Sequence, residues 1–456
     1  MRKTSCFIVL AAALVASCAV APSPADAPDG TREAQGGFPP PPPRAPDAVV
    51  LGLLLPLAHP DAGVRRTADD LFKAAQMAVF DAGDTPLVLL PRDTGGTPEG
   101  ARKAAAHAVA DGASLIIGPL FSGSAAALGN ASAVPVLAFS NDRNVRARNL
   151  WLFGFLPEQN IDRIVSQSIG QGFTRFAALL PDNADGARIG KVFAARVARY
   201  GGTLVRVESY RADAKDMFAP VRAIADFDRR KAAHAAEEKR LADAARALAP
   251  PETTEAGLFE AVKEIAPELY AAHETLQRAE TLGDIPYDAV FMPEGGLAVR
   301  NLAPLLPYFD IDPRRVKFIG TGLWDDPSLG NEPPLQGAWY AAPDPTLWHG
   351  FARRFADRFG RKPVRLSSLA YDAVSLAARL HAIRPDAPFR RDILTDPNGF
   401  SGIDGIFRLT ADGANARGLA VQEIGGSRLI DAAPASFVER ARRRAAAQAL
   451  AQRLKP

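Results

Sequence analysis

The chain has 456 residues, 47% of them hydrophobic, and is therefore long enough to bury the cores of two lobes. Its 54 Lys and Arg residues nearly balance its 51 Asp and Glu residues, so a broad basic field is absent and nucleic acid is not an expected partner. The two cysteines, Cys6 and Cys18, both lie close to the N-terminus, which excludes a disulfide framework in the rest of the chain.

The first 17 residues have the pattern of a bacterial lipoprotein signal. A basic start precedes an apolar run over residues 7–15, and small residues follow directly before Cys18. This run is much shorter than the roughly 20 apolar residues that a helix needs to cross a bilayer. We therefore predict a signal peptide over residues 1–17, cleavage before Cys18 and lipidation of its thiol. The alternative is an ordinary secretory peptide with a chance cysteine.

Residues 18–46 form a proline-rich segment with few large apolar side chains. Such a segment buries too little surface to fold, and the proline run over residues 39–43 favours an extended conformation of about 3.1 Å per residue. We predict a tether between the membrane anchor and a folded domain. A proline-rich docking ligand for a partner is the alternative.

From residue 49 onwards, short apolar runs alternate with amphipathic stretches of helical length, which is typical of repeated β-α units. The runs are continuous, as expected for parallel strands that helices cover on both faces. We predict strands over residues 49–55, 87–90, 115–117 and 134–139, and helices over residues 67–82, 98–111 and 122–131. Thr67 is the predicted N-cap of the first of these helices.

A second series of the same kind follows. We predict strands over residues 151–156, 176–180, 203–207, 289–292 and 316–319, and helices over residues 161–169 and 189–200. Together the two series predict an α/β fold with two lobes, each a doubly wound and mainly parallel sheet. Periodicity alone also allows a single eight-stranded barrel.

Three further segments lie outside this alternation. Residues 217–282 are rich in Ala and charged residues and predict an insertion of two exposed helices, with either a solvated or a partner-binding surface. Phe351, Phe355 and Phe359 recur every four residues, so they share one helix face and are predicted to be core. Residues 433–456 predict a basic C-terminal helix, either solvated or in contact with an anionic surface.

Ligands of open parallel sheets bind at the carboxyl ends of the strands, and three loops of the first lobe carry polar side chains there. The candidate ligand-binding residues of this lobe are Asp93, Ser122, Ser124, Ser140 and Asn141. Their polar groups could contact a carboxylate or a sugar. Each of these residues could equally cap a helix or form a turn.

The second lobe is expected to contribute a facing set, consisting of Glu294, Thr321 and Trp324. Glu294 could meet an amino group, and Trp324 could stack on a ligand, close the cleft, or be a hinge or core aromatic residue. The six histidines show no H-E-x-x-H spacing, and a G-x-S-x-G motif is absent from the sequence. We therefore expect a non-enzymatic binding protein without a metal or a cofactor.

The residues also carry a family resemblance. Residues 49–142, with Gly118–Pro119 and Ser140–Asn141, resemble type I periplasmic binding proteins, the superfamily of branched-chain amino acid receptors. Within it, residues 288–344 look most like the penicillin-binding protein activator lipoproteins. The segments that carry this second resemblance are 291–293, 320–327 and 337–343. The resemblance covers almost the whole chain after the tether.

The resemblance implies two lobes joined by three crossovers, which are expected near residues 156–157, 342–343 and 400–403. The expected two-lobed domain spans residues 47–432, with lobe 1 at about 47–156 and 343–400 and lobe 2 at about 157–342 and 401–432. A penicillin-binding protein that synthesises peptidoglycan is the implied partner. Better-known activators of this type carry a large helical-repeat domain ahead of the binding-protein fold, and here the tether occupies that place.

These features predict a lipid-anchored protein at the periplasmic face of the cell envelope that regulates peptidoglycan synthesis by binding a penicillin-binding protein. The alternative is the substrate-binding lipoprotein of an importer, with an amino acid or a related small molecule as ligand. A hydrolase of cell-wall fragments is a third class. A receptor needs a polar, roomy pocket, whereas an activator would fill the gap with apolar side chains. Ala19, directly after the anchor, resembles the residue found in lipoproteins sent to the outer membrane.

Overall fold

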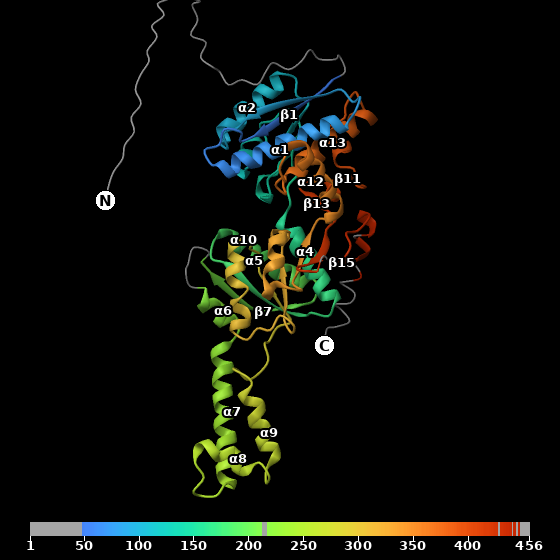
Figure 1. Ribbon diagram of the computed structural model, residues 1–456. Coiled ribbons are helices and arrows are strands. Elements are labelled where there is room, and N and C mark those ends of the chain that lie inside the picture. Colours follow the sequence, from blue (N-terminus) through green and yellow to red (C-terminus); the bar gives the residue numbers. More distant parts are fainter. Residues whose placement is uncertain (1–47, 212–216, 427–428, 440, 444–445, 447–456) are drawn as a thin grey trace, which may run out of the picture. The chain divides into compact units, whose positions relative to one another are not determined.

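The computed structural model (Figure 1) describes residues 48–211, 217–426, 429–439, 441–443 and 446. The predicted signal peptide, Cys18, the tether and most of the predicted C-terminal helix lie outside the described residues. Within the described ranges, helices that combine the length and the apolar character needed to cross a membrane are absent.

Lobe 1 is built on a five-stranded parallel sheet. Its strands are β1 (Val49–Leu55), β2 (Leu87–Asp93), β3 (Leu115–Ile117), β4 (Val136–Ala138) and β5 (Leu150–Leu152). They lie in the order β2-β1-β3-β4-β5, which is a doubly wound arrangement and not a closed barrel. The strands predicted for this lobe are therefore confirmed, although β2 is longer and β4 and β5 are shorter than predicted.

Helices cover both faces of this sheet. They are α1 (Ala62–Asp81), α2 (Pro98–Ala110), α3 (Ser122–Leu128), α12 (Pro345–Phe359), α13 (Ser367–Ile383) and α14 (Arg391–Leu394). Leu51 and Leu53 of β1 pack with α1, α12 and α13, whereas Val50 and Leu54 pack with α2 and α3. This alternation follows from the two-residue period of a strand, and it explains why β1 is apolar throughout.

Two local predictions for the lobe 1 helices have different outcomes. Thr67 is not the N-cap of α1: the helix begins after Asp61, whose Oδ1 accepts a 2.9 Å hydrogen bond from the Val64 N–H. Thr67 lies inside the helix instead and donates its hydroxyl to the Gly63 carbonyl. In α12, Phe351 and Phe355 are buried in the lobe 1 core and Phe359 packs against it, as predicted.

Lobe 2 repeats the same arrangement with two added strands. Its strands are β6 (Arg175–Pro181), β7 (Thr203–Tyr210), β8 (Ala289–Phe291), β9 (Lys317–Gly320), β10 (Trp339–Ala342), β14 (Ala420–Glu423) and β15 (Leu429–Asp431). The order is β15-β14-β10-β9-β8-β6-β7, and β14 and β15 are antiparallel to their neighbours. The sequence predicted β6 to β9 but not β10, β14 or β15.

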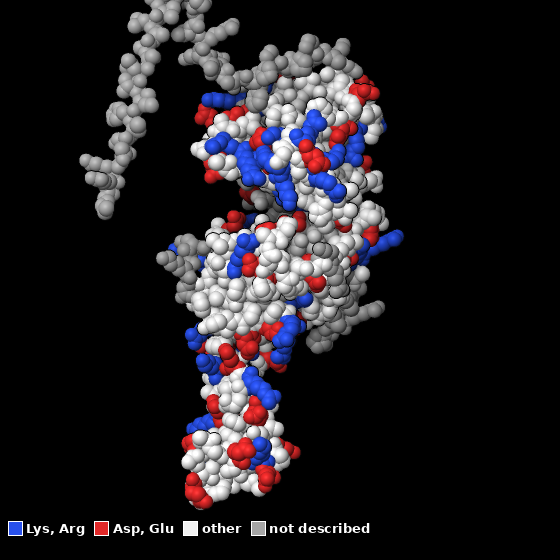
Figure 2. Space-filling model, viewed as in Figure 1, with Lys and Arg blue, Asp and Glu red and all other residues white. Residues whose placement is uncertain are grey.

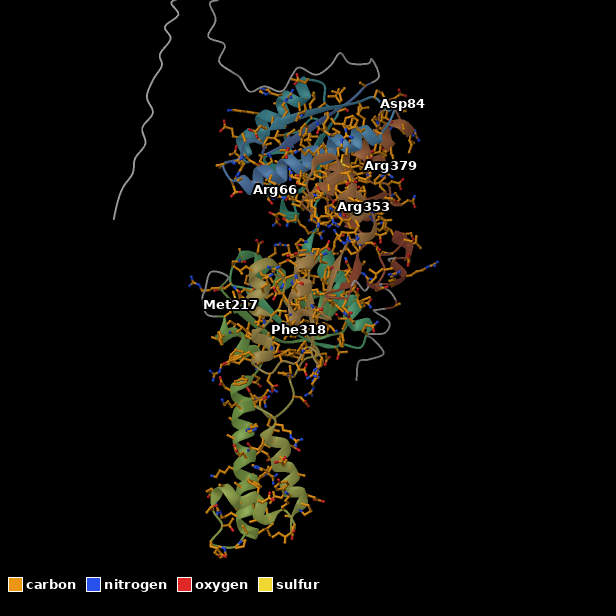
Figure 3. All side chains as sticks on the ribbon, in the orientation of Figure 1. Arg66, Asp84, Met217, Phe318, Arg353 and Arg379 are labelled. Atoms are coloured by element: carbon orange, nitrogen blue, oxygen red, sulfur yellow. The ribbon has the colours of Figure 1, made fainter. Side chains whose placement is uncertain are left out.

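Helices on the two faces enclose the lobe 2 cores. They are α4 (Pro157–Gly170), α5 (Ala184–Arg199), α10 (Gly296–Leu302) and α11 (Leu305–Tyr308). One core lies under α4 and α5, and the other, on the opposite face, includes Met217 and Phe318 (Figure 3). Short 3₁₀ turns complete the described elements: Arg143–Val145, Glu255–Gly257, Gly322–Trp324, Pro327–Asn331 and Pro333–Leu335.

A small antiparallel sheet corrects the predicted third crossover. It consists of β11 (Phe400–Gly402), β12 (Gly405–Leu409) and β13 (Asn415–Arg417). Phe407 and Leu409 belong to the lobe 1 core, and the Trp151 Nε1–H donates to the Thr410 carbonyl at 3.1 Å. The chain therefore returns to lobe 2 between β13 and β14, and not at residues 400–403 as predicted. The segment was misassigned because its strands are short, at three, five and three residues, and contain no long continuous apolar run.

Buried amide side chains tie the crossovers together. The Gln159 Nε2 atom lies 2.7 Å from Asn415 Oδ1, and Asn415 Nδ2 donates to the Leu152 and Gly154 carbonyls at 2.8 Å. Asn160 Nδ2 donates to the Ala341 carbonyl at 2.7 Å. Because buried amide groups are costly to leave unpaired, this network holds the connecting segments in one arrangement.

The predicted insertion contains more helices than the two expected. Its helices are α6 (Phe218–Ile224), α7 (Phe227–Leu248), α8 (Leu258–Val262) and α9 (Pro267–Gln277). The first, α6, belongs to the lobe 2 core, whereas α7, α8 and α9 share a small core of their own around Ala245, Leu258 and Val262. Figure 2 shows side chains of both charges over α7, α8 and α9, as on a solvated surface.

Candidate functional site

Each sheet has one point where the strand order reverses, and ligands of open α/β sheets bind at that edge. In lobe 1 the reversal lies between β1 and β3, and in lobe 2 between β6 and β8. We define the lobe 1 rim as residues 55–61, 93–97, 118–124 and 139–142, and the lobe 2 rim as residues 181–185, 210–211, 292–297 and 320–326. All eight predicted ligand-binding residues lie on these two rims.

The lobe 1 rim brings two of the predicted serines together. Ser122 Oγ and Ser140 Oγ are 3.0 Å apart, and Ser140 Oγ also accepts the Asp142 N–H at 3.1 Å. Since Ser140 can donate its own hydrogen to Ser122, the hydroxyl hydrogen of Ser122 is available to an acceptor from outside the protein. The pair can therefore present one donor to a carboxylate or a hydroxyl group.

Ser124 lies two residues further along α3. Its side chain is 1% exposed, and its Oγ has no hydrogen-bond partner among the residues that the structure describes. Buried hydroxyls are normally paired, because an unpaired one loses the hydrogen bonds it makes in water. Asn141 is exposed beside the serine pair. The rings of His59 and Phe121, whose centroids are 5.6 Å apart, border the same rim.

Asp93 has a structural task on this rim. Its Oδ1 atom accepts the Ala58 N–H at 3.1 Å and the Gly95 N–H at 3.0 Å, so it joins the loops after β1 and β2. The residue was predicted to contact a ligand. In this structure it shapes the loops next to the serine pair.

Trp324 and Thr321 support the lobe 2 rim from below. The Trp324 side chain is 1% exposed, its Nε1–H donates to the Glu294 carbonyl at 2.7 Å, and its ring lies so close to Gly320 that a Cβ there would come within 2.3 Å. Thr321 is buried and donates its hydroxyl to the Pro293 carbonyl at 3.1 Å. Trp324 is thus a core residue in this structure and offers no ring face for stacking on a ligand.

Glu294 differs from these two because its carboxyl group is only partly buried. Burial and the nearby charge of Asp185 raise the pKa of Glu294 above its usual value. Tyr210 lies at the end of β7. Its burial, and to a smaller extent the charge of Glu294, raises the pKa of its phenol. The Tyr210 hydroxyl is buried, and no other described residue forms a hydrogen bond with it.

Sequence reasoning missed three contributors to the lobe 2 rim, Tyr210, Asp185 and Leu297, and assigned no role to Leu323 within its rim loop. Leu297 and Leu323 are 74% and 61% exposed, and Leu323 lies against Gly295. The predicted strand over residues 203–207 ended three residues before Tyr210, which hid its place at the sheet edge. Asp185 lies in the first turn of α5, four residues after the end of β6, and the predicted helix began only at residue 189.

A chain of ion pairs connects lobe 1 with the lobe 2 rim. Arg365, between α12 and α13, places its Nε atom 3.0 Å from Asp325 Oδ2 of the lobe 2 rim and its Nη1 atom 2.7 Å from Asp404 Oδ1. Asp404 is fully buried and also accepts the Ser368 hydroxyl at 2.7 Å. Nothing in the sequence spacing indicated this arrangement, since its members lie up to 79 residues apart.

Two more charged groups complete this hinge cluster, which consists of Arg365, Asp325, Asp404, Asp372 and Arg417. Burial, followed by the charge of Asp404, raises the pKa of Asp372 to about 7. Arg417 is 2% exposed, and its guanidinium lies 5.0 to 5.4 Å from the ring centroids of three phenylalanines. Burial lowers the pKa of Arg417 from its ordinary value. Burying these charged groups where the lobes join therefore costs desolvation free energy, which their ion pairs must offset.

Residues 48–257 match the family model described as periplasmic binding protein. Comparison with curated proteins gives no match. In the described part of the chain, groups of three or more His, Cys, Asp or Glu side chains arranged to hold a metal ion do not occur.

Solved structures give the same fold. The branched-chain amino acid ABC transporter periplasmic ligand-binding protein of Burkholderia xenovorans aligns with a TM-score of 0.59 and 16% identity, over 82% of this chain and 90% of that one. A Rhodopseudomonas palustris solute-binding protein in complex with 3,4-dihydroxybenzoic acid aligns with a TM-score of 0.54 and 17% identity, over 85% of this chain and 97% of that one. A Desulfitobacterium hafniense substrate-binding protein in complex with Leu aligns with a TM-score of 0.52 and 16% identity, over 84% of this chain and 100% of that one.

These similarities and the strand orders define the architecture. The chain has the two-lobed type I periplasmic binding protein fold. The resemblance noted in the sequence is confirmed at this level. The neighbours reported above are ligand-binding proteins of ABC transporters, so the narrower resemblance to penicillin-binding protein activators has no counterpart among them.

Proposed function

We propose that this protein is a periplasmic solute-binding lipoprotein of an importer and that it binds a small, amino-acid-like molecule between its two rims. One observation carries the proposal: Ser124 and Tyr210, one on each rim, are buried hydroxyls without a described partner. Ligand-binding pockets commonly contain a few such groups, whose hydrogen bonds the ligand completes.

The chemistry of the rims supports an amino acid in particular. The serine pair of lobe 1 presents a hydroxyl donor, which suits a carboxylate. Glu294 and Asp185 of lobe 2 form an acidic pair, which suits an ammonium group. Leu297 and Leu323 add apolar surface for a side chain. Binding of this kind involves no bond making, so the protein acts by recognition.

A thermal-shift screen of the twenty amino acids and of small aromatic acids tests the proposal. Ligand binding to the folded state should raise the melting temperature, because a ligand at one hundred times its Kd stabilises the folded protein by about 2.7 kcal/mol. Ser122→Ala and Glu294→Gln should each reduce the shift. Asp386→Asn, an exposed change in lobe 1, is the matched control and should leave the shift unchanged. A screen without any shift would refute the proposal.

A second candidate function is the regulation of peptidoglycan synthesis through a penicillin-binding protein. The observation that favours it is the exposed apolar pair Leu297 and Leu323, since such residues on a rim suit a protein partner. Pull-down of purified synthases with the wild-type protein and with Leu323→Ser separates the candidates. Under this second function the substitution abolishes capture, whereas under the first no synthase is captured.

The membrane anchor belongs to the proposal as well. Lipidated Cys18 and a proline-rich tether would hold the binding domain at the periplasmic face of the outer membrane. Mass spectrometry of the N-terminal peptide should show an acylated Cys18, and Cys18→Ser should release the protein from isolated envelopes. An unmodified N-terminus at another residue would contradict this part.

A further inference from the structure

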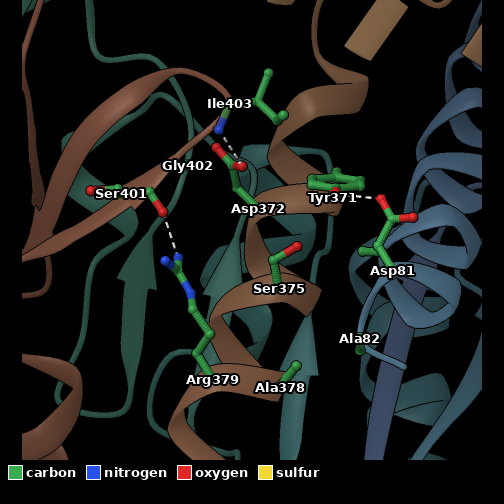
Figure 4. A pocket seen from close by; sticks show the side chains of 11 residues that line it. Asp81, Ala82, Tyr371, Asp372, Ser375, Ala378, Arg379, Ser401, Gly402 and Ile403 are labelled. Carbon is green, nitrogen blue, oxygen red and sulfur yellow. Dashed lines mark hydrogen bonds between the residues drawn. The ribbon is translucent and has the colours of Figure 1, made fainter. Parts of the chain in front are cut away.

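A cavity lies in lobe 1 apart from both rims. It has a volume of about 350 Å³ and lies between α1, α13 and β11 (Figure 4). None of its lining residues belongs to either rim. The volume is at the lower end of the range for small-molecule sites. The cavity is therefore a separate feature that the proposed function leaves unexplained.

One side of the cavity carries the carboxylate of Asp81, which is ion-paired with Arg354 and partly exposed. Asp81 is the last residue of α1, and the last turn of that helix contains no basic residue, so the negative end of the helix dipole adds to the Asp81 carboxylate. Asp81 Oδ2 accepts the Tyr371 hydroxyl at 2.6 Å and Arg354 Nη1 at 2.8 Å. These two donors hold the carboxylate in place, and it remains 39% exposed.

The other side carries a positive charge. Arg379, which Figure 3 also labels, is exposed and donates one N–H to the Ser401 carbonyl. A guanidinium has five such donors, so further donors remain for a ligand. Figure 4 shows Arg379 and Asp81 on opposite sides of Ser375. No hydrogen bond is described for the Ser375 hydroxyl within the residues that the structure covers.

The floor between the two sides is rigid. Asp372 accepts the Ile403 N–H at 2.7 Å, and a Cβ at Gly402 would come within 2.3 Å of its carboxylate. Only glycine therefore fits at position 402 with this floor. The hydrogen bonds of Asp81 to Tyr371 and Arg354, and of Arg379 to the Ser401 carbonyl, restrict the spacing between the two sides above this floor, which favours selective binding.

We propose that this cavity is a second binding site, for a small zwitterion. Its ammonium group lies toward Asp81, and its carboxylate lies toward Arg379 and Ser375, so that both ends form charge-assisted hydrogen bonds. A simple anion would approach the Asp81 carboxylate, and a simple cation would approach the Arg379 guanidinium, so either is disfavoured. The site does not depend on the proposed function of the rims.

Titration calorimetry of the mature protein with amino acids of increasing length tests this assignment. The probes are glycine, β-alanine, 4-aminobutyrate and 6-aminohexanoate, with acetate and methylamine as singly charged controls. Because hydrogen bonds restrict the spacing of the two charged sides, one chain length should bind best, and both controls should bind at least tenfold more weakly. Equal affinity for all probes would overturn the proposal.

Variants locate the site. Arg379→Gln and Ser375→Ala should weaken the best probe, by about tenfold for the arginine, and Ala378→Leu should fill the cavity and abolish binding. Arg384→Gln, an exposed arginine next to the C-terminus of α13, is the matched control and should have no effect. Since Arg379 is exposed, its variant should fold normally. Unchanged binding in Arg379→Gln would overturn the proposal.

The rims provide the second arm of the experiment. Ser122→Ala should leave binding of the best probe unchanged, whereas loss of binding in Ser122→Ala together with full binding in Arg379→Gln would assign the probe to the rims and overturn the second site. Conversely, thermal shifts that persist in Ser122→Ala and Glu294→Gln but are lost in Arg379→Gln would refute the proposed function and support the second site. The two failures are therefore distinguishable.

Discussion

The two rims hold their loops by different means. The lobe 2 rim rests on the buried ring of Trp324, which packs on Gly320 and binds the Glu294 carbonyl. The lobe 1 rim rests on side-chain hydrogen bonds at the surface, chiefly those from Ala58 and Gly95 to Asp93. The lobe 2 rim is thus coupled to one large buried ring, whereas the loops after β1 and β2 in the lobe 1 rim are joined through one exposed carboxylate.

The rims also differ in chemistry. Lobe 1 presents neutral hydroxyls, Ser122, Ser124 and Ser140, and lobe 2 presents acidic groups and exposed leucines. Because of this difference, neither rim alone is complementary to an amino acid. A carboxylate suits the first rim and an ammonium group the second, so the proposed ligand is recognised only when both take part.

The largest expected effect follows from the buried ring. Trp324→Ala removes a fully buried indole and its hydrogen bond, so the free energy of unfolding should fall by about 3–5 kcal/mol in chemical denaturation. Trp324→Phe should lose less because most of the packing remains. Leu347→Ala, at a residue that is 57% exposed, is the control and should change stability by less than about 0.5 kcal/mol. A Trp324→Ala protein as stable as wild type would contradict the proposed support of the lobe 2 rim by the buried Trp324 ring.

A pH dependence of stability should arise on the lobe 1 side of the hinge cluster. The Asp372 pKa rises from 3.8 to about 7 on folding, so between these values the folded state keeps a proton that the unfolded state has lost. Stability should therefore fall as the pH rises from about 4 to 7, by up to about 1.4 kcal/mol per pH unit.

Denaturation curves of Asp372→Asn at several pH values measure this contribution. The variant should lose this part of the slope, because its amide does not titrate and its oxygen can still accept the Ile403 N–H. Asp386→Asn, which is exposed, serves as the control. An identical slope in wild type and Asp372→Asn would show that the hinge cluster does not titrate in this range.

The sequence predicted buried parallel strands better than short antiparallel ones. Continuous apolar runs located β1, β3, β6 and β8 well, because buried parallel strands leave a strong signal. The short strands β11 to β13 gave none, since only alternate residues face a core. The predicted rim residues lie on the rims, but whether an aromatic or acidic side chain is a ligand contact or a support depends on its neighbours. Trp324 and Asp93 illustrate this.

A smaller effect is expected from the hydrogen bonds of the lobe 1 rim. Asp93→Ala removes the acceptor of two backbone N–H groups, and stability should fall by about 1–2 kcal/mol. Asp93→Asn keeps an oxygen acceptor and should lose less. Thermal unfolding of the two variants beside wild type measures both. A loss as large as that of Trp324→Ala would mean that the two rims are supported alike.

The smallest effect concerns affinity and not stability. Since burial and Asp185 raise the pKa of Glu294, its carboxylate takes up a proton at a higher pH than usual. The affinity for a ligand with an ammonium group should therefore fall as the pH is lowered through that pKa. In Glu294→Gln the affinity should be lower and independent of pH in this range. Titration calorimetry at several pH values compares the two proteins.

We propose that the two rims divide the recognition of a single small zwitterion between them. The most direct test titrates wild type, Ser122→Ala and Glu294→Gln with the best amino acid of the thermal-shift screen, with its amide and with its deaminated analogue. Ser122→Ala should reduce the discrimination against the amide, and Glu294→Gln should reduce the discrimination against the deaminated analogue. Full discrimination in both variants, or equal losses for every ligand, would contradict the account.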